Sequence, residues 1–353
     1  MSRSAEPTAT PRHMRAVLLN GHGGTDQLEY REDVPVPVPG SGEVLVRVQA
    51  AGLNNTDINT RIGWYAKSAD SATDATGGGW AGDALSFPRI QGADACGYIA
   101  AVGAGVAESR RGERVLIDPV LRTAGGRARY FGSDTQGAFA QFTIVPASNA
   151  RPVRSPLSDV ELASFPCAYL AAENMLTRAA VTTGETILVT GASGGVGSAA
   201  VQLGRRRGAT VIAIAEPAKA HAIEALGAAR VLPRAASLLP ALGRESIEAV
   251  IDVVGGDGFA ERLELLVRTG RYAVAGAIAG ADVRLDLRTL YLKDLCLLGC
   301  TIPDQGVFAN LVGYIERGEI RPLISATYPL EEIAAAQSLF MRKSHVGKIV
   351  LTI

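Results

Sequence analysis

The chain has few cysteines, few aromatic residues and no excess of charge of either sign. Its four cysteines, Cys96, Cys167, Cys296 and Cys300, lack the dense spacing of a secreted disulfide framework. We therefore expect free thiols in a reducing cytoplasm. Residues four apart in a strand lie roughly 13 Å from each other, too far for Cys296 and Cys300 to share one metal ion.

Charge is balanced, with 35 basic and 35 acidic residues. Nucleic-acid scaffolds and polybasic membrane surfaces need a net positive field, so the balance argues against both as partners. Every long apolar run contains breakers, and we expect no membrane-spanning helix. Met1 to Arg12 lack the apolar core of a signal peptide, and residues 1–13 are expected to form a disordered extension.

The 353 residues, 47% of them hydrophobic, exceed what one core usually supports, which predicts two domains. Short strand-like segments punctuated by glycine and proline fill the first half, a pattern typical of a β barrel or sandwich. They are residues 14–19, 43–50, 97–102, 114–117 and 140–145. The alternating prolines of residues 35–39 favour an extended linker over a central strand.

A long stretch of small residues from Ile62 to Pro88 interrupts this half and carries Trp64, Tyr65 and Trp80. Loops of that length inside a compact domain often act as lids or binding loops. A plain surface excursion is the alternative.

After Arg151 strands alternate with helices, which predicts a parallel sheet with helices on both faces. Strands are expected at residues 186–190, 210–214, 249–254, 272–275 and 295–302, and helices at 198–207 and 219–226. Arg205, Arg206 and Arg207 end the first of these helices, where cations complement the helix dipole; an anion patch is the alternative. The strand-like tail, residues 346–351, is expected to return to the first domain.

The sharpest motif, residues 188–197, lies between a strand and a helix. Gly194 and Gly195 let the backbone approach a pyrophosphate, and Gly197 lets the helix pack closely on the strand. The N–H groups at the helix start then face the phosphates. This order of strand, glycines, helix and strand predicts a dinucleotide site.

Residues 191–197 are similar to the cofactor turn of the medium-chain dehydrogenase/reductase superfamily, in its zinc-free quinone-oxidoreductase-like branch. Further similar segments follow the family's order, at residues 51–57, 91–97, 112–115, 226–228 and 347–351. The resemblance runs from Met14 onward. It implies an α/β protein with a GroES-like β-rich catalytic domain at residues 14–150 and 303–353, and a Rossmann domain with a doubly wound parallel sheet at residues 151–302. It also implies a homodimer through the strand near residues 295–302, whose apolar edge would otherwise be exposed.

Zinc alcohol dehydrogenases of this superfamily take their catalytic ligands from a Cys, a His and a second Cys. The matching positions here are Asn54, Ala93 and Cys167. One thiolate with a nearby Asp94 does not make the usual ligand set, and no cysteine cluster stands between Gly97 and Tyr130 for a structural zinc. We predict no zinc, with Cys167 a small buried residue.

Without a Lewis acid, an acceptor that is already electron-poor is favoured over a plain ketone, because one or two hydrogen-bond donors then suffice. We predict direct hydride transfer from NADPH to a small quinone or enone. The Asn54 amide and the Tyr65 hydroxyl are the candidate donors, Tyr65 also as proton source, with Asp57 orienting the segment. Local backbone bonding by Asn54 and loop packing by Tyr65 are the alternatives. A zinc-independent alcohol or carbonyl dehydrogenase, a specialised biosynthetic reductase, and an inactive NADPH-binding regulatory or structural protein remain alternatives.

The preference for NADPH depends on the residue that ends the second strand of the predicted parallel sheet, residues 210–214. Ile214 stands where an acidic residue would read the ribose 2′-hydroxyl. Lys219 matches the branch's lysine that faces a 2′-phosphate, while Glu216 keeps NADH open. The resemblance implies cofactor contacts at Gly191, Ser193, Gly194, Gly195, Val196, Lys219, Val253, Gly276 and Lys348.

Overall fold

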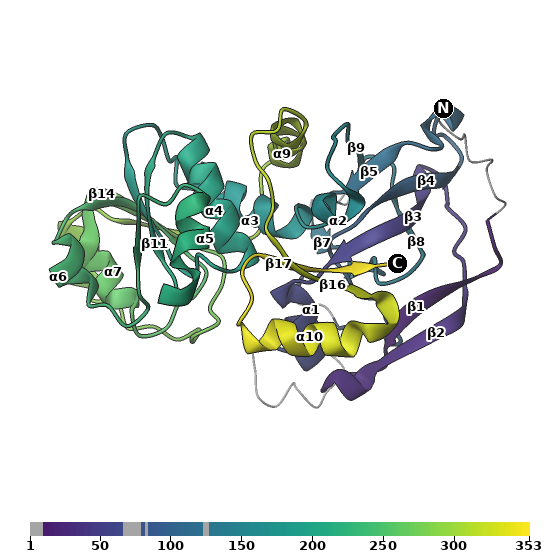
Figure 1. The fold of residues 1–353 in the computed structure, drawn as a ribbon, viewed down its shortest axis with the longest axis horizontal. Helices are drawn as coiled ribbons and strands as arrows, with labels where there is room; N and C mark the ends of the chain where they lie inside the picture. Colours follow the sequence, from purple (N-terminus) through teal and green to yellow (C-terminus); the bar gives the residue numbers. More distant parts are fainter. Residues whose placement is uncertain (1–9, 66–78, 82–83, 123–126) are drawn as a thin grey trace. The chain divides into compact units, whose positions relative to one another are not determined.

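The computed structural model describes residues 10–65, 79–81, 84–122 and 127–353. The chain forms two compact units (Figure 1). Unit 1 comprises residues 1–166, 326–342 and 349–353, and unit 2 comprises residues 167–325 and 343–348. Of the expected disordered extension, residues 1–9 lie outside the described part of the chain, and His13 begins the first strand.

The unit boundaries lie later in the chain than the sequence predicts. Residues 151–166 remain with unit 1 because β9 (Ala150–Pro152) pairs with β5 (Arg114–Ile117), and Arg114 forms an ion pair with Asp159. Residues 303–325 belong to unit 2, where Tyr314 of α9 (Val307–Glu316) donates a hydrogen bond to Glu173. The first transition falls at the start of α3 (Pro166–Arg178) and the second within β16 (Ile324–Pro329), so no linker marks either of them in the sequence.

Unit 1 is built on an antiparallel sheet, as the alternating segments of the first half predict. Its strand order is β16 (Ile324–Pro329), β17 (Lys348–Thr352), β3 (Glu43–Gly52), β4 (Cys96–Val102), β5 and β9. β8 (Phe142–Pro146) also pairs with β3. The C-terminal strand joins the sheet of unit 1, as the sequence predicts, since β17 lies antiparallel to β3 with Val350 opposite Gly52.

Shorter elements close the core of unit 1. β1 (His13–Leu19) pairs with β2 (Leu28–Pro35), and β6 (Val120–Arg122) pairs with β7 (Ala128–Tyr130). The helices are α1 (Asn55–Ile62), α2 (Asp159–Leu162) and α10 (Ile333–Arg342). Ile333, Ala336 and Phe340, spaced by three and four residues, put one face of α10 into the core.

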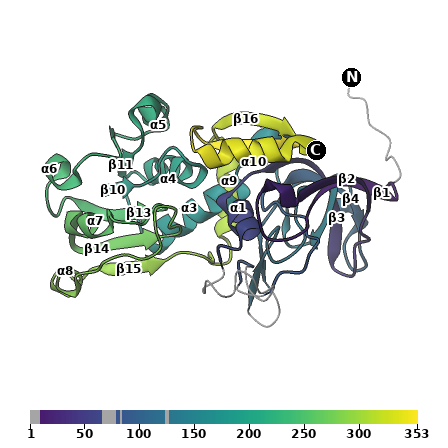
Figure 2. The same ribbon diagram turned by 90° about the horizontal axis from the view of Figure 1, so that it is seen from below.

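Unit 2 is a doubly wound parallel sheet, which confirms the predicted fold class. Its strand order is β12 (Arg230–Leu232), β11 (Thr210–Ile214), β10 (Thr186–Val189), β13 (Ile247–Asp252), β14 (Leu266–Val274) and β15 (Cys296–Gly299). The helices, all labelled in Figure 2, are α3 (Pro166–Arg178), α4 (Gly195–Arg206), α5 (Ala220–Ala225), α6 (Leu238–Leu242), α7 (Phe259–Leu265), α8 (Leu287–Leu292) and α9. Strand order reverses at β10, between β11 and β13, where α/β sheets bind their ligands.

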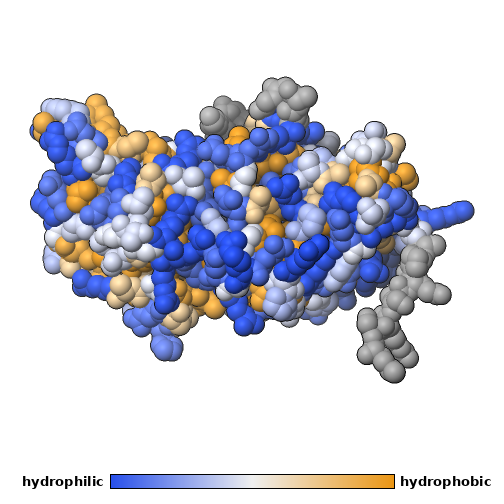
Figure 3. Space-filling model, turned by 90° about the horizontal axis from the view of Figure 1, so that it is seen from above, coloured by the Kyte–Doolittle hydropathy of each residue, from blue (hydrophilic) through white to orange (hydrophobic). Residues whose placement is uncertain are grey.

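The surface is mixed in character. On the face drawn in Figure 3, hydrophilic residues are interspersed with smaller hydrophobic areas, in keeping with the balanced charge of the chain. Within the described residues, no helix has the length and apolar character needed to cross a membrane.

Candidate functional site

The glycine turn, residues 191–197, joins β10 to α4 at the point where the sheet order reverses. Gly191 has a φ of 57°, a left-handed conformation that favours glycine. A Cβ on Gly197 would stand 2.2 Å from the Gly191 carbonyl oxygen, so only glycine allows this helix to lie so close to its strand. A Cβ on Gly194 would meet nothing nearer than 3.5 Å. Gly194 therefore leaves space beside the N-terminus of α4, where backbone N–H groups attract phosphates.

The predicted cofactor residues of unit 2 gather around this turn. Ser193 accepts a hydrogen bond from the Gly347 N–H, at 2.8 Å. The aliphatic part of Lys348 covers Gly195, because a Cβ there would lie 2.8 Å from the Lys348 Cδ. Val196 lies in the first turn of α4. The turn and the segment before β17 thus form one surface of unit 2.

Val253 and Gly276 meet at the ends of neighbouring strands. A Cβ on Gly276 would lie 2.7 Å from the Val253 carbonyl oxygen. These two backbones are therefore in contact at the carboxyl edge of the sheet, beside the glycine turn, where Val253 N–H donates to the Thr190 hydroxyl.

Lys219 is buried and holds the segment before β17. Its ammonium donates to the carbonyl oxygens of Lys343 and His345, at 2.7 and 3.0 Å. Burial lowers the pKa of Lys219, and nearby Arg234 lowers it further. Burial also lowers the pKa of Lys343 to about 8. Lysines 219, 343 and 348 all contribute to lowering the pKa of His345 to about 4, after burial, which places them in one cationic cluster.

Sequence reasoning missed Lys343 as part of this cluster, and it missed Asp252. The Asp252 carboxylate is fully buried, accepts from Arg262 at 2.9 Å and from the Val254 N–H at 2.8 Å, and also bonds Thr190 and Tyr272. These bonds join the ends of β10, β13 and β14. An acidic residue at the end of an apolar strand, three positions before the first of the paired glycines 255 and 256, was the available signal.

In unit 1, Asn54 and Asp57 come together at the start of α1. The Asp57 carboxylate accepts a hydrogen bond from the Asn54 backbone N–H at 2.7 Å, so Asp57 orients the turn between β3 and α1. The Asn54 amide donates to the Asp94 carboxylate at 2.9 Å and to the Gly52 carbonyl at 3.3 Å. All three polar side chains are buried. The amide nitrogen of Asn54 therefore bonds within this cluster, and its carbonyl oxygen is an acceptor.

Tyr65 follows α1 and packs edge-on against Trp64, with ring centroids 5.5 Å apart. Trp80 stacks at a tilt on Tyr130, with centroids 4.8 Å apart. Most of the long segment that was expected to form a lid or a surface excursion, residues 66–78 and 82–83, lies outside the described residues. The described ends of that segment are thus rich in aromatic rings.

The donor set in unit 1 does not fit a zinc ion. The Asn54 amide nitrogen is a hydrogen-bond donor to Asp94, and neighbouring Ala93 offers no side-chain donor atom. In the part of the chain that the structure describes, no three His, Cys, Asp or Glu side chains cluster as a metal site would require. Cys167 is buried, as predicted.

Comparison with known proteins identifies the family of the chain. Residues 40–155 match the alcohol dehydrogenase GroES-like domain, and residues 226–351 match the zinc-binding dehydrogenase family. The acryloyl-coenzyme A reductase of Metallosphaera sedula is 29% identical over 96% of this chain and 100% of its own length. The quinone oxidoreductase of Rattus norvegicus is 27% identical over 96% of this chain and 97% of its own.

A crystal structure from Sinorhizobium meliloti 1021, named as a candidate alcohol dehydrogenase, has a TM-score of 0.89 and 46% identity, covering 97% of both chains. The fold and the glycine turn define a nicotinamide-dependent oxidoreductase. This chain belongs to the medium-chain dehydrogenase/reductase superfamily, as its sequence motifs predict.

Proposed function

We infer that the protein uses NADPH to reduce a small conjugated carbonyl compound, an enone or a quinone, without zinc. The observation that carries this proposal is the buried hydrogen bond from Asn54 to Asp94. By resemblance, Asn54 and Ala93 stand where the zinc enzymes of the superfamily carry a Cys and a His ligand. A conjugated acceptor needs less charge stabilisation than a plain ketone. The relatives named as acryloyl-coenzyme A reductase and quinone oxidoreductase act on acceptors of this class, which supports the same choice here.

Two features of unit 2 support NADPH as the cofactor. β11 ends at Ile214, which offers no carboxylate to a ribose hydroxyl, and Glu216 forms an ion pair with Arg234 at 3.3 Å. The cluster of Lys219, Lys343 and Lys348 supplies positive charge beside the glycine turn. A 2′-phosphate would find cations there, while Glu216, which acts on Lys219 electrostatically, is paired with Arg234.

When bound, the nicotinamide supplies a hydride to the electron-poor carbon of the acceptor, and a proton completes the reduction. The residues of unit 2 would hold the phosphates at the start of α4 and on the lysines. In unit 1, Asp57 and Asp94 fix the Asn54 backbone and side chain. The Tyr65 hydroxyl is the proposed proton source, with Asn54 shaping the acceptor pocket.

Steady-state rates with an enone, a quinone and a simple aldehyde test the proposal. We expect turnover of the conjugated acceptors with NADPH, little with the aldehyde, and no loss of rate after chelation. Tyr65→Phe should lower kcat by about ten- to a hundredfold with little change in KM, the scale of one general acid. Lys343→Gln should raise the KM for NADPH about tenfold and leave that for NADH unchanged.

Arg47 is exposed on β3 of unit 1, so Arg47→Gln is a matched control that removes a cation elsewhere. Stoichiometric zinc whose removal abolishes activity would contradict the metal-free proposal. Equal effects of Lys343→Gln on both cofactors would contradict the choice of NADPH.

A further inference from the structure

A buried carboxylate lies at the carboxyl edge of the sheet in unit 2, where the glycine turn also lies. Asp252, the last residue of β13, is completely buried, and the Arg262 guanidinium donates to it at 2.9 Å. Buried ion pairs contribute little to stability, because the loss of hydration offsets most of the attraction between the charges. The stability of the fold therefore does not by itself account for a carboxylate at this edge.

Two donors to Asp252 belong to the segment that follows β13. The Val254 N–H donates to the carboxylate at 2.8 Å, and the Gly255 N–H donates at 3.2 Å. Gly255 has a φ of 66°, a left-handed conformation that favours glycine, and its carbonyl oxygen accepts from Arg262 at 3.2 Å. The ion pair therefore holds both sides of one tight turn and sets the direction in which the chain leaves β13.

A third donor connects the carboxylate to the glycine turn. Thr190 is buried directly before Gly191, and its hydroxyl donates to Asp252 at 2.5 Å. The same hydroxyl oxygen accepts a hydrogen bond from the Val253 N–H at 3.1 Å. Val253 and Val254 pack over Gly191, where a Cβ would lie 3.1 Å from a methyl group of each valine. Thr190 thus links the glycine turn to the segment after β13.

Tyr272 completes the shell of donors around Asp252. Burial, and then the charge of Asp252, raise the pKa of Tyr272, so its hydroxyl keeps its proton and donates to the carboxylate. One carboxylate oxygen accepts from Thr190 and the Val254 N–H, and the other accepts from Arg262 and Tyr272. Rotation of the carboxylate would break several of these bonds in a buried site, so its orientation is fixed.

The place of these groups in the sheet indicates which half of the cofactor they serve. β10 lies between β11 and β13. In folds of this type the ribose of the adenosine half is read at the end of the second strand, here β11, and the dinucleotide extends across the point where the strand order reverses. The segment after β13 is therefore on the side of the nicotinamide half.

We propose that Asp252 is a positioning residue for the nicotinamide half of the cofactor, and that Thr190 couples it to Val253 and to the glycine turn. Asp252 does not contact the cofactor itself but holds the backbone that does. Displacing reacting groups by about 1 Å lowers a rate by up to about a hundredfold, so the support behind a binding wall affects turnover. The inference rests on the proposed binding of NADPH and does not depend on the acceptor.

Thr190→Val tests the proposal, because it keeps the size of the side chain and every charge and removes only the hydroxyl. We expect kcat to fall about ten- to a hundredfold, and the dissociation constant of NADPH to rise about tenfold. Adenosine 2′,5′-bisphosphate, which lacks the nicotinamide half, should bind as it does to the native protein. Thr190→Ser keeps the hydroxyl and should recover the native values. Steady-state rates and calorimetric titration measure these quantities.

Asp252→Asn tests the carboxylate itself and should separate NADPH from its adenosine fragment in the same way. This variant leaves the Arg262 charge buried without its partner, so its unfolding midpoint is measured alongside. Thr190→Val, in which both charges remain, decides the question if Asp252→Asn does not fold.

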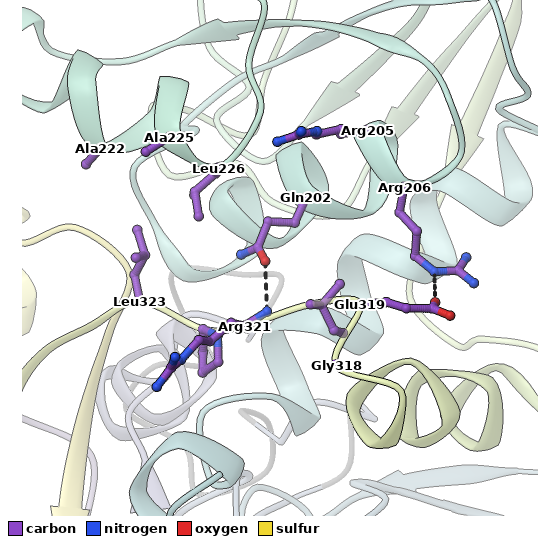
Figure 4. Close-up of a pocket in the computed structure, with 12 residues that line it drawn as sticks. Gln202, Arg205, Arg206, Ala222, Ala225, Leu226, Gly318, Glu319, Arg321 and Leu323 are labelled. Carbon is purple, nitrogen blue, oxygen red and sulfur yellow. Dashed lines mark hydrogen bonds and ion pairs between the residues drawn. The ribbon is translucent and has the colours of Figure 1, made fainter. Parts of the chain in front are cut away.

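Two control variants each lose a hydrogen bond elsewhere in unit 2. Thr183→Val makes the same change before the start of β10, where the Thr183 hydroxyl donates to the Arg207 carbonyl at 2.9 Å. Arg206→Gln breaks the bond to Glu319 that is drawn in Figure 4. Arg206 lies about 16 Å along α4 from Gly195, given eleven residues at the helical rise. Both controls should leave kcat and both dissociation constants unchanged.

The two ligands separate a positioning role from a structural one. A general loosening of unit 2 would weaken NADPH and adenosine 2′,5′-bisphosphate alike. Equal weakening of both ligands in Thr190→Val, or native values for both, would overturn this inference and leave the proposed function standing. A native protein that binds no NADPH would contradict the proposed function, and this inference with it.

Discussion

His345 is a half-buried histidine beside the lysine cluster that the cofactor is proposed to contact. Burial first, and then Lys343, Lys219 and Lys348, lower its pKa to about 4. The folded protein therefore keeps the imidazole neutral at a pH where the unfolded chain takes up a proton. The cationic cluster depends on this neutrality, because a fourth charge would repel the other three.

This difference in pKa predicts a pH dependence of stability. The pKa of His345 in the folded protein lies below the ordinary value near 6.5, so the unfolded chain binds a proton at this residue first as the pH falls. The stability that the neutral imidazole contributes to folding is therefore fully present above pH 6.5 and is lost as the pH falls through about 4. In His345→Gln, the fall in unfolding free energy between pH 7 and pH 4 should be smaller by on the order of 2 kcal/mol. Urea unfolding from pH 4 to pH 7 measures it, with His221→Gln, an exposed histidine, as control. Identical slopes for His345→Gln and the native protein would contradict this assignment.

At the scale of elements, the turn between β10 and α4 has to pack closely against its strand and also leave space for a phosphate. Gly197 meets the first requirement and Gly194 the second. Gly197 is needed for packing, since its Cβ would collide with the Gly191 carbonyl. Gly194 leaves room beside the start of the helix and packs against little. The sequence motif predicts this division, and the close Gly191 carbonyl oxygen agrees with the packing role of Gly197.

A matched pair of substitutions tests this division. Gly197→Ala should cost about 2–4 kcal/mol of unfolding free energy, because its methyl group has no space. Gly194→Ala, at a φ of −81°, should fold normally and bind cofactor more weakly, since the methyl group stands where the pyrophosphate approaches. Chemical unfolding and cofactor fluorescence titration measure the two quantities. The interpretation fails if Gly197→Ala is as stable as the native protein.

The elements also show what the sequence predicts and what it does not. β5 and β11 were predicted at their observed bounds, because a short β-branched run between turn residues is an unambiguous signal. α10 and β2 were not predicted. The buried face of α10 combines apolar residues with a small and a polar one, which is a weak pattern; its members are Ile333, Ala336, Gln337 and Phe340. Half of the residues of β2 are charged, in a strand that pairs with β1.

The candidate site was predicted in parts. Asn54, Asp57 and the glycine turn follow local motifs, and the structure places Asn54 and Asp57 together. The bond from Asn54 to Asp94 joins residues forty positions apart, and the carbonyl contacts of Lys219 join residues more than a hundred apart. Such contacts are set by the topology of the chain, which a local pattern does not contain.

At the scale of the whole molecule, β15 is the last strand of the sheet in unit 2 and presents exposed apolar side chains. Leu297 on β15 is 39% exposed, and Leu287, Tyr291 and Leu292 on α8 are more exposed still. An open apolar edge of this kind favours pairing with another chain. The dimer expected through this edge remains a prediction.

Leu297→Glu should convert that dimer to a monomer, because it places a charge in the pairing edge. Sedimentation at micromolar concentration measures the change. Val38→Glu, at an 85% exposed position in unit 1, serves as control and should leave the mass unchanged. A native protein that sediments as a monomer would exclude the dimer.

The chain from Lys343 to Ile353 serves both units in turn. Residues 343–348 accept hydrogen bonds from the Lys219 ammonium, and the Gly347 N–H donates to the Ser193 carbonyl oxygen in the glycine turn. The next residues form the strand that pairs with β3. A premature stop after Arg342, or trimming by a carboxypeptidase, would therefore strip a strand from one sheet and the support from the other unit's phosphate turn. Loss of these eleven residues would be expected to inactivate the enzyme, so affinity tags are better attached at the opposite terminus.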